Sequence, residues 1–263
     1  KSDDNIYRFY LEVSQGLSMA YWNSTRETYQ VVVKQNGTFY LRDRRSSTSC
    51  GAVSKLDDSL ADTIVKAAGL HKEMFMVNRM FPGTPIVVPV NSIVRVNVKN
   101  MMMTDTLSIH WHGLSQYNTF YMDGVSRVTQ CPIGPGDSFT YEFQVTELGT
   151  HWYHAHSGEQ RMDGVYGPLI VTSTFKDGSI VNSDVAPPFK YEKEFFFHVQ
   201  EWFQNKASSI VQTIIWEDMK YLYGFDEMNK CLESTYTDDG TSSILFPFVR
   251  ETDTIVINGK VFN

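Results

Sequence analysis

Apolar and polar residues alternate along much of the chain with the period of two that is typical of β-strands. Turn sequences rich in glycine and proline separate these stretches, as in residues 132–137, and Tyr166-Gly167-Pro168 is predicted to be another connector. The predicted strands are Tyr7–Val13, Thr28–Val33, Ile86–Val90, Ile93–Val98 and Ser138–Val145. Short strands joined by such turns predict an all-β fold, a Greek-key β-sandwich or barrel, rather than alternating strands and helices.

One stretch departs from this period. Residues Ser59 to Leu70 have helical spacing, with Ser59 as the candidate N-cap and Gly69 as the candidate stop. We expect a short helix or an ordered insertion at this place in the β-domain.

The composition changes after residue 172. Residues 173–189 are polar and contain an Asp-Gly and a Pro-Pro pair, which is typical of a linker. An aromatic strand is predicted at Glu194–Val199, and Thr254–Phe262 has the pattern of a strand followed by a turn. We therefore expect one domain over residues 1–172 and the start of a second, incomplete β-domain over residues 190–263, so that the chain looks cut rather than finished.

Composition and charge exclude several classes of protein. The 263 residues are 42% hydrophobic and 20% charged, which excludes a disordered or fibrous chain. The net charge is -7 and no basic block with interleaved aromatic residues occurs, so we expect no nucleic-acid partner. No apolar run approaches the roughly 20 residues that span a bilayer, so no membrane span is expected.

Four of the seven histidines form two His-x-His pairs, His110 with His112 and His154 with His156. Each pair ends a strand-like run, and side chains two apart on a strand point the same way, with Cα atoms about 6.5 Å apart. The pairs are therefore predicted to bind metal. Imidazole ligands favour copper, zinc, nickel or iron over calcium and magnesium. One tetrahedral zinc site is an alternative, although two histidines of one strand reach neighbouring ions more easily than they converge on one.

The motifs around these pairs resemble the first domain of laccase-type multicopper oxidases, and most of all invertebrate laccases. The resemblance is dense over about residues 74 to 171, with the motifs in a single order. Its main segments are Ile109-His110-Trp111-His112-Gly113-Leu114, Tyr121-Met122-Asp123-Gly124-Val125, Thr129-Gln130-Cys131-Pro132-Ile133 and Gly149-Thr150-His151-Trp152-Tyr153-His154-Ala155-His156-Ser157-Gly158.

The resemblance implies cupredoxin-like domains and a copper cofactor. His110 would bind a type 2 copper, and His112, His154 and His156 would bind a type 3 pair, which is half of a trinuclear cluster that reduces dioxygen to water. Asp123 matches an acidic residue that helps deliver protons in laccases, although Asp-Gly is also a common turn dipeptide.

The remaining histidines and the aromatic neighbours are expected to have structural roles. His151 projects differently from the second pair and is expected to be packed or to support a ligand. His71 and His198 are isolated, so each is expected to be an ordinary surface or core histidine. A further set of residues flanks the ligands and is expected to pack the copper-bearing strands, namely Trp111, Trp152 and Tyr153.

The resemblance also implies a disulfide and an extracellular location. The cysteine of the Thr-Gln-Cys-Pro-Ile motif bonds to the second domain in related laccases, so Cys131 is predicted to pair with Cys231, which leaves Cys50 over. Two sequons, at Asn23 and Asn36, are candidate glycosylation sites if the protein is secreted.

One departure from the family bears on function. None of the three cysteines has a histidine within ten positions, so the chain has no type 1 copper motif. We expect the isolated chain to be inactive and to need a C-terminal cupredoxin domain, of the same or another chain, besides dioxygen and a small reducing substrate. The alternatives are a non-catalytic extracellular matrix or structural glycoprotein built from cupredoxin domains, and a copper carrier.

Overall fold

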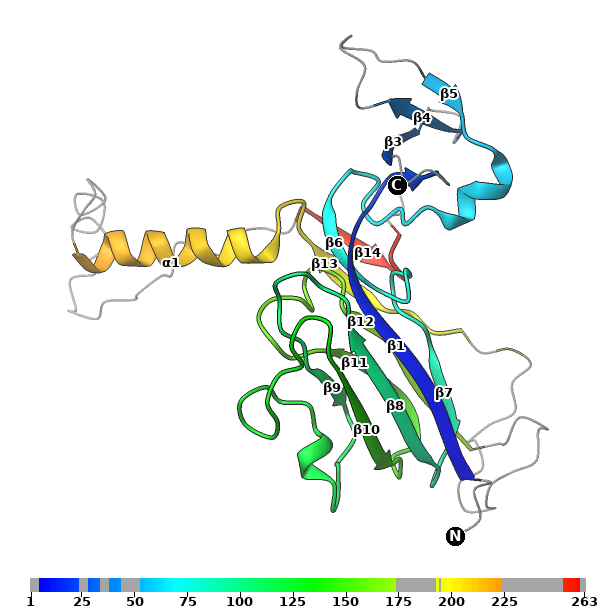
Figure 1. Cartoon of the computed structure of the whole chain (residues 1–263), viewed down its shortest axis with the longest axis vertical. Coiled ribbons are helices and arrows are strands. Elements are labelled where there is room, and N and C mark those ends of the chain that lie inside the picture. The colour runs from blue at the N-terminus through cyan, green and yellow to red at the C-terminus, as the bar shows by residue number, and fades with distance from the viewer. Residues whose placement is uncertain are drawn as a thin grey trace, which may run out of the picture.

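The computed structural model describes residues 5–23, 28–33, 38–43, 53–173, 193, 195–223 and 253–260. Two four-stranded sheets face each other around one hydrophobic core, and Figure 1 shows them as the long body of the molecule. The predicted all-β sandwich is confirmed. The described residues include no helix long and apolar enough to cross a bilayer.

The first sheet follows from strict alternation along its strands. In β8 (Ile93–Asn100) every second residue is buried, so that Val94, Val96 and Val98 enter the core. β8 pairs in parallel with β1 and antiparallel with β10. The order of the sheet is β10 (Ser138–Gln144), β8, β1 (Ile6–Leu17), β6 (Glu73–Val77).

The second sheet contains both histidine pairs. Its order is β7 (Ile86–Pro89), β12 (Tyr166–Thr172), β11 (Gly149–Ala155), β9 (Ile109–His112). β11 lies between β9 and β12 and is antiparallel to both, whereas β7 and β12 are parallel. The two histidine strands are therefore direct neighbours.

The core holds β9 against the first sheet through Trp111. Its ring is fully buried, with ring centres 5.2 Å from Tyr141 and 4.9 Å from Phe143 of β10. The backbone N–H of Ile109 donates to the Tyr141 hydroxyl at 3.0 Å. These contacts fix the position and orientation of the strand that ends in the first histidine pair.

The connector predicted at Tyr166-Gly167-Pro168 is wrong, because these residues begin β12. Glycine is required there because a Cβ at residue 167 would collide with the ring of Tyr153 on β11. Pro168 lies opposite Trp152 in the ladder. The composition that suggested a turn instead permits a close approach of two strands.

The helix expected over Ser59–Leu70 is shorter, and its cap is a different residue. A 3-10 helix, η2, covers Asp58–Thr63 and ends where Ile64 becomes extended. The Asp57 carboxylate accepts the Ser59 N–H at 2.9 Å, so Asp57 is the N-cap. Aspartate and serine both favour capping, and the N-cap lies two residues earlier than the predicted cap at Ser59.

A small antiparallel sheet with its own apolar cluster precedes this helix. Its strands are β2 (Ala20–Trp22), β3 (Thr28–Val33), β4 (Phe39–Asp43) and β5 (Val53–Lys55). Only β3 is among the predicted strands. Its cluster is Met19, Val31, Leu56 and Ile64.

The C-terminal segments pack against the first domain. β13 (Val199–Trp202) pairs antiparallel with β14 (Thr254–Ile257), and Trp202 joins a buried cluster with Met74 and Met76. α1 (Ala207–Tyr223), which the sequence analysis did not predict, follows β13. The expected strand and turn after Thr254 are confirmed over residues 254–259. The linker and domain boundaries stay predictions, since residues 174–192 lie outside the described part.

The aromatic strand expected at Glu194–Val199 is wrong within the described residues. Residues 195–198 are irregular, and β13 begins only at Val199. The side chain of Asn258 bonds to the backbone of this segment, so a side chain takes the place of a neighbouring strand. Phe195 and Phe197 are 76% and 75% exposed.

Candidate metal centre

Strand alternation places the histidines on the outer face of the second sheet. The intervening residues of β9 and β11, among them Ile109, Trp111 and Tyr153, point into the core and are fully buried. The register pairs His110 with His154 across the two strands. Because neighbouring side chains on one face of a sheet are within contact distance, the strands bring the two His-x-His pairs together.

Three of the predicted ligands converge. The ligand nitrogens of His110, His112 and His154 all lie within 4.8 Å of one another. Nδ1 of His112 and Nε2 of His154 are 3.3 Å apart. Two nitrogens bound at about 2.0 Å to one ion in tetrahedral geometry are about 3.3 Å apart, so this pair has the spacing that a shared ion requires.

His156 lies on the same face but is more peripheral. Its ring centre is 5.6 Å from that of His110 and 6.1 Å from that of His154, and its side chain is exposed. The His156 N–H donates to the carbonyl of Ser108 at 2.9 Å, which continues the pairing of the two strands. The group of three converging nitrogens does not include His156, so its role as a fourth ligand stays a prediction.

In two of the imidazoles, a hydrogen bond to a backbone carbonyl shows which ring nitrogen is free to bind a metal. Nδ1 of His110 lies 2.8 Å from the carbonyl oxygen of Asp123, and Nδ1 of His154 lies 2.9 Å from that of Ala155. A carbonyl oxygen only accepts, so each Nδ1 carries a proton and donates it. The lone pair of Nε2 is therefore available for a metal in both residues.

Asp123 contacts the first ligand in two ways. Besides its carbonyl, its carboxylate Oδ1 lies 3.3 Å from Nδ1 of His110. Asp123 follows the 3-10 helix η3 (Phe120–Met122) and precedes Gly124, which has φ +81°. A Cβ at Gly124 would collide with the carbonyl oxygen of Ile109, so glycine is needed to bring this loop against β9. Asp123 therefore lies in a turn and also contacts His110.

The site favours neutral imidazoles. Burial lowers the pKa of His154 to about 4, and its side chain is 3% exposed. Burial and then the neighbouring His110 also lower the pKa of His112. A low pKa leaves the ring nitrogen unprotonated at neutral pH, and an unprotonated nitrogen is what a metal ion needs.

The other histidines are separate from the converging group. Nε2 of His151 bonds to the carbonyl of Glu147 at 3.0 Å, and Nδ1 of His71 lies 3.3 Å from that of Met19. The ring of His198, which was expected to be an ordinary surface or core histidine, packs against Trp152 beside the cluster. Trp111 and Tyr153 pack the strands as expected, whereas Trp152 lies on the histidine face.

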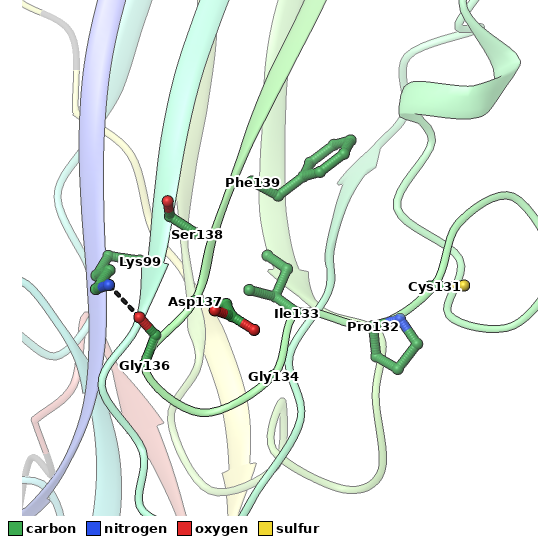
Figure 2. Close-up of a pocket in the computed structure, with 9 residues that line it drawn as sticks. All are labelled: Lys99, Cys131, Pro132, Ile133, Gly134, Gly136, Asp137, Ser138 and Phe139. Carbon is green, nitrogen blue, oxygen red and sulfur yellow. Dashed lines mark hydrogen bonds between the residues drawn. The ribbon is translucent and has the colours of Figure 1, made fainter.

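Cys131 lies at the edge of a surface hollow of about 410 Å³ that no histidine lines. Figure 2 shows the hollow beside Lys99 and the turn at Gly134–Asp137, with the Cys131 sulfur directed away from them. Cys131 is exposed. Its predicted partner Cys231 lies outside the described residues, as do Cys50 and Asn36, and Asn23 borders residues that are not described. The disulfide and the glycans stay predictions.

The fold and the site together define a β-sandwich protein with an imidazole cluster that could hold a metal ion. The donor set fits copper, because it contains only imidazole nitrogens. The sequence model of the multicopper oxidase family matches residues 60–175, so this part of the chain is similar to a multicopper oxidase domain. Copper is the metal that this family implies.

Individual relatives agree with this assignment. The chain is 35% identical over 156 residues to Laccase-1 of Cryptococcus neoformans, a match that covers 59% of this chain and 24% of that protein. It is 39% identical over 131 residues to the L-ascorbate oxidase of Cucumis sativus, covering 50% of this chain and 21% of that protein. The chain thus matches about a quarter of the length of these relatives.

Solved structures show the same fold. The crystal structure of the laccase from Botrytis aclada superposes with a TM-score of 0.53 at 26% identity, covering 79% of this chain and 28% of that one. Fet3p, a multicopper oxidase that functions in iron import, superposes with a TM-score of 0.54 at 22% identity, over 97% of this chain and 33% of that one.

Proposed function

We propose that this chain is part of a secreted, laccase-like multicopper oxidase. Such an enzyme couples the one-electron oxidation of a phenol, an aromatic amine or a metal ion to the reduction of dioxygen to water. The observation that carries the proposal is the convergence of three imidazole nitrogens within 4.8 Å of one another. An all-imidazole donor set suits copper in both of its oxidation states, as single-electron transfer requires. The similarity to laccases and ascorbate oxidases supports the same function.

In this proposal His110 binds the type 2 copper, and His112, His154 and His156 bind the type 3 pair. Bound copper supplies the single-electron redox chemistry. The carbonyl of Asp123 holds the proton on Nδ1 of His110 and so directs Nε2 toward the metal. The Asp123 carboxylate, 3.3 Å from the same Nδ1, provides a proton acceptor beside the cluster.

The other half of the cluster comes from a C-terminal cupredoxin domain of the same or another chain. That domain also supplies the type 1 copper, because no cysteine of this chain has a histidine within ten positions. The 263-residue chain alone is therefore inactive. An extracellular location, with glycans at Asn23 and Asn36, belongs to the same proposal.

Metal analysis combined with an oxygen-uptake assay on the native, unfragmented protein tests the proposal. Several coppers per chain together with oxygen uptake support the oxidase. A protein without copper is a matrix or structural glycoprotein, and a protein that binds copper without uptake is a carrier; either result overturns the proposal.

A pair of substitutions makes the test specific to the site. In the same native protein His154→Ala abolishes oxygen uptake, because it removes a ligand from the centre of the group. The control His71→Ala retains uptake, because His71 bonds to the carbonyl of Met19 and is not in that group. Equal uptake in the two variants contradicts the assignment of the site.

A further inference from the structure

The ring of His198 lies on the histidine face of the second sheet. It stacks on Tyr166, with ring centres 4.2 Å apart and planes 14° apart. Its edge contacts Trp152, with ring centres 5.4 Å apart and planes 64° apart. In the sheet register Tyr166 is opposite His154, so both contacts are made next to a predicted ligand. His198 belongs to the segment before β13, far in sequence from the histidine strands.

Trp152 lies between His198 and the converging imidazoles. Its ring centre is 4.3 Å from that of His154 and 5.1 Å from that of His112. The angles between the planes are 39° and 35°, so the indole packs obliquely against both ligands. A movement of Trp152 therefore changes the space that is available to two of the three converging rings.

The backbone of His198 is held by Asn258, in the turn after β14. The His198 N–H donates to Oδ1 of Asn258 at 2.8 Å, and the Asn258 N–H donates to the His198 carbonyl at 2.9 Å. Nδ2 of Asn258 donates to the carbonyl of Phe196 at 3.0 Å. The next residue, Gly259, has φ +75°, and a Cβ there would come within 2.5 Å of the carbonyl oxygen of Phe81. The turn is thus held against the first domain, and it fixes the site of His198.

We infer that His198 is a positioning residue for the metal centre, which holds Trp152 against His112 and His154 so that their nitrogens stay convergent. The inference rests on the proposed copper-binding function of these histidines. Stacking on Tyr166 leaves the His198 ring little rotational freedom, and its edge then blocks the rotation of Trp152. The residues after the linker thus take part in shaping a site whose converging ligands all come from the first domain.

The geometry indicates that His198 supports the ligands and is not itself a ligand. His198 is not in the group of converging nitrogens. One ring face is covered by Tyr166, and the ring lies beyond Trp152 from the imidazoles. Groups that orient metal ligands from outside the coordination sphere typically change metal affinity by roughly 10- to 100-fold when they are substituted.

Copper titration of the full chain tests the inference, with two readouts that do not depend on oxidase activity. The first is quenching of tryptophan fluorescence, and the second is the EPR spectrum of bound Cu²⁺. His198→Ala is expected to weaken copper binding about 10-fold and to alter the EPR hyperfine splitting. His198→Phe keeps a ring on Tyr166 and against Trp152, so it restores the affinity and spectrum of the unsubstituted chain. The matched control Phe197→Ala removes a neighbouring ring that is 75% exposed and changes neither readout.

A second variant tests the inference independently, in case His198→Ala does not fold. Asn258→Ala removes no ring but removes the side-chain bonds to the backbone of residues 196 and 198. His198 is then no longer held in position, so affinity and spectrum shift in the same direction. Unchanged affinity and EPR spectrum in both His198→Ala and Asn258→Ala overturn the inference, as does an equal loss in His198→Ala and His198→Phe. A different result, in which the unsubstituted native protein, with its C-terminal domain, binds no copper, overturns the proposed function itself.

Discussion

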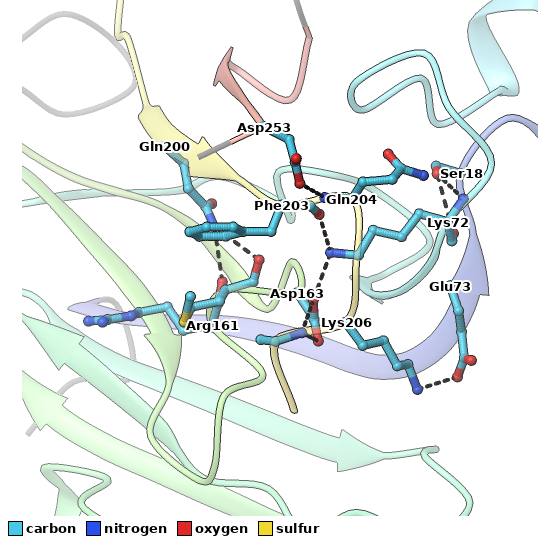
Figure 3. A network of polar contacts seen from close by, with 12 residues as sticks. Ser18, Lys72, Glu73, Arg161, Asp163, Gln200, Phe203, Gln204, Lys206 and Asp253 are labelled. Carbon is cyan, nitrogen blue, oxygen red and sulfur yellow. Dashed lines mark hydrogen bonds and ion pairs between the residues drawn. The ribbon is translucent and has the colours of Figure 1, made fainter. Parts of the chain in front are cut away.

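Nζ of Lys72 lies 2.8 Å from Oδ1 of Asp163, and the two side chains are only 2% and 4% exposed. Lys72 also donates to the carbonyl of Phe203 at 2.8 Å (Figure 3). Its Nζ lies 4.2 Å from the ring centre of Trp202. Asp163 accepts the N–H of Ala207, the first residue of α1. One buried ion pair therefore connects the first domain to β13 and to the start of the helix.

The first prediction concerns this pair. Asp163→Asn removes the negative charge and leaves the Lys72 ammonium buried without a counter-ion, so the free energy of unfolding falls by about 3 kcal/mol in urea denaturation. The control is Glu73→Gln at the exposed pair with Lys206, where side chains are 47% and 31% exposed. Solvent screens that pair, so its loss costs about 1 kcal/mol or less. Equal effects of the two substitutions contradict the prediction.

The second prediction concerns the loop that carries Asp123. Gly124→Ala combines a left-handed backbone with a collision against the carbonyl of Ile109. We expect a loss of about 2–3 kcal/mol in unfolding free energy, together with weaker copper binding because β9 and Asp123 shift. Gly136→Ala is the matched control, since Gly136 has φ +80° but nothing within 4 Å of its Cβ position. It costs about 1 kcal/mol and leaves copper binding unchanged. If Gly124→Ala is as stable as Gly136→Ala, the close approach of residue 124 to the carbonyl of Ile109 is excluded.

The third prediction concerns pH and the metal-free chain. The pKa of His154 is about 4 in the folded chain and near the ordinary histidine value of 6.5 in the unfolded chain. The unfolded state therefore binds the extra proton first as the pH falls, so this group lowers the free energy of unfolding between pH 6.5 and 4, by about 3 kcal/mol in total. Above pH 6.5 both states are neutral and the group has no effect.

Urea denaturation of the metal-free chain at pH 7 and at pH 4.5 measures this effect. Because carboxyl groups also titrate in this range, the comparison is with His154→Gln, which keeps a polar side chain but does not titrate. The drop in stability between the two pH values is expected to be smaller in His154→Gln. An equal drop in both chains contradicts a depressed pKa at His154.

The histidine cluster could be predicted because it depends on local periodicity. Residues two apart on a strand share a face, so the two His-x-His sequences indicated two pairs of imidazoles without any knowledge of the fold. Their convergence needed one further fact, the register that sets His110 opposite His154. That register depends on packing at Trp111 and Tyr153, and no local pattern encodes it.

The parts that the sequence did not predict depend on contacts between distant residues. Tyr166-Gly167-Pro168 has the composition of a turn, and only the ring of Tyr153 explains why it is a strand. His198 has no local motif, and its position results from Asn258, 60 residues later in the chain. The start of α1 is likewise capped by Asp163, which is 44 residues away.

Copper content after loading and exhaustive dialysis tests the central claim most directly. The full chain and a His71→Ala control are expected to retain Cu²⁺ with an EPR spectrum that shows nitrogen ligands. The triple variant His110→Ala, His112→Ala and His154→Ala is expected to lose that copper while keeping the far-UV circular dichroism of the β-fold. Copper retained by the triple variant at the same stoichiometry and with the same spectrum would contradict the assignment of the metal centre to these three imidazoles.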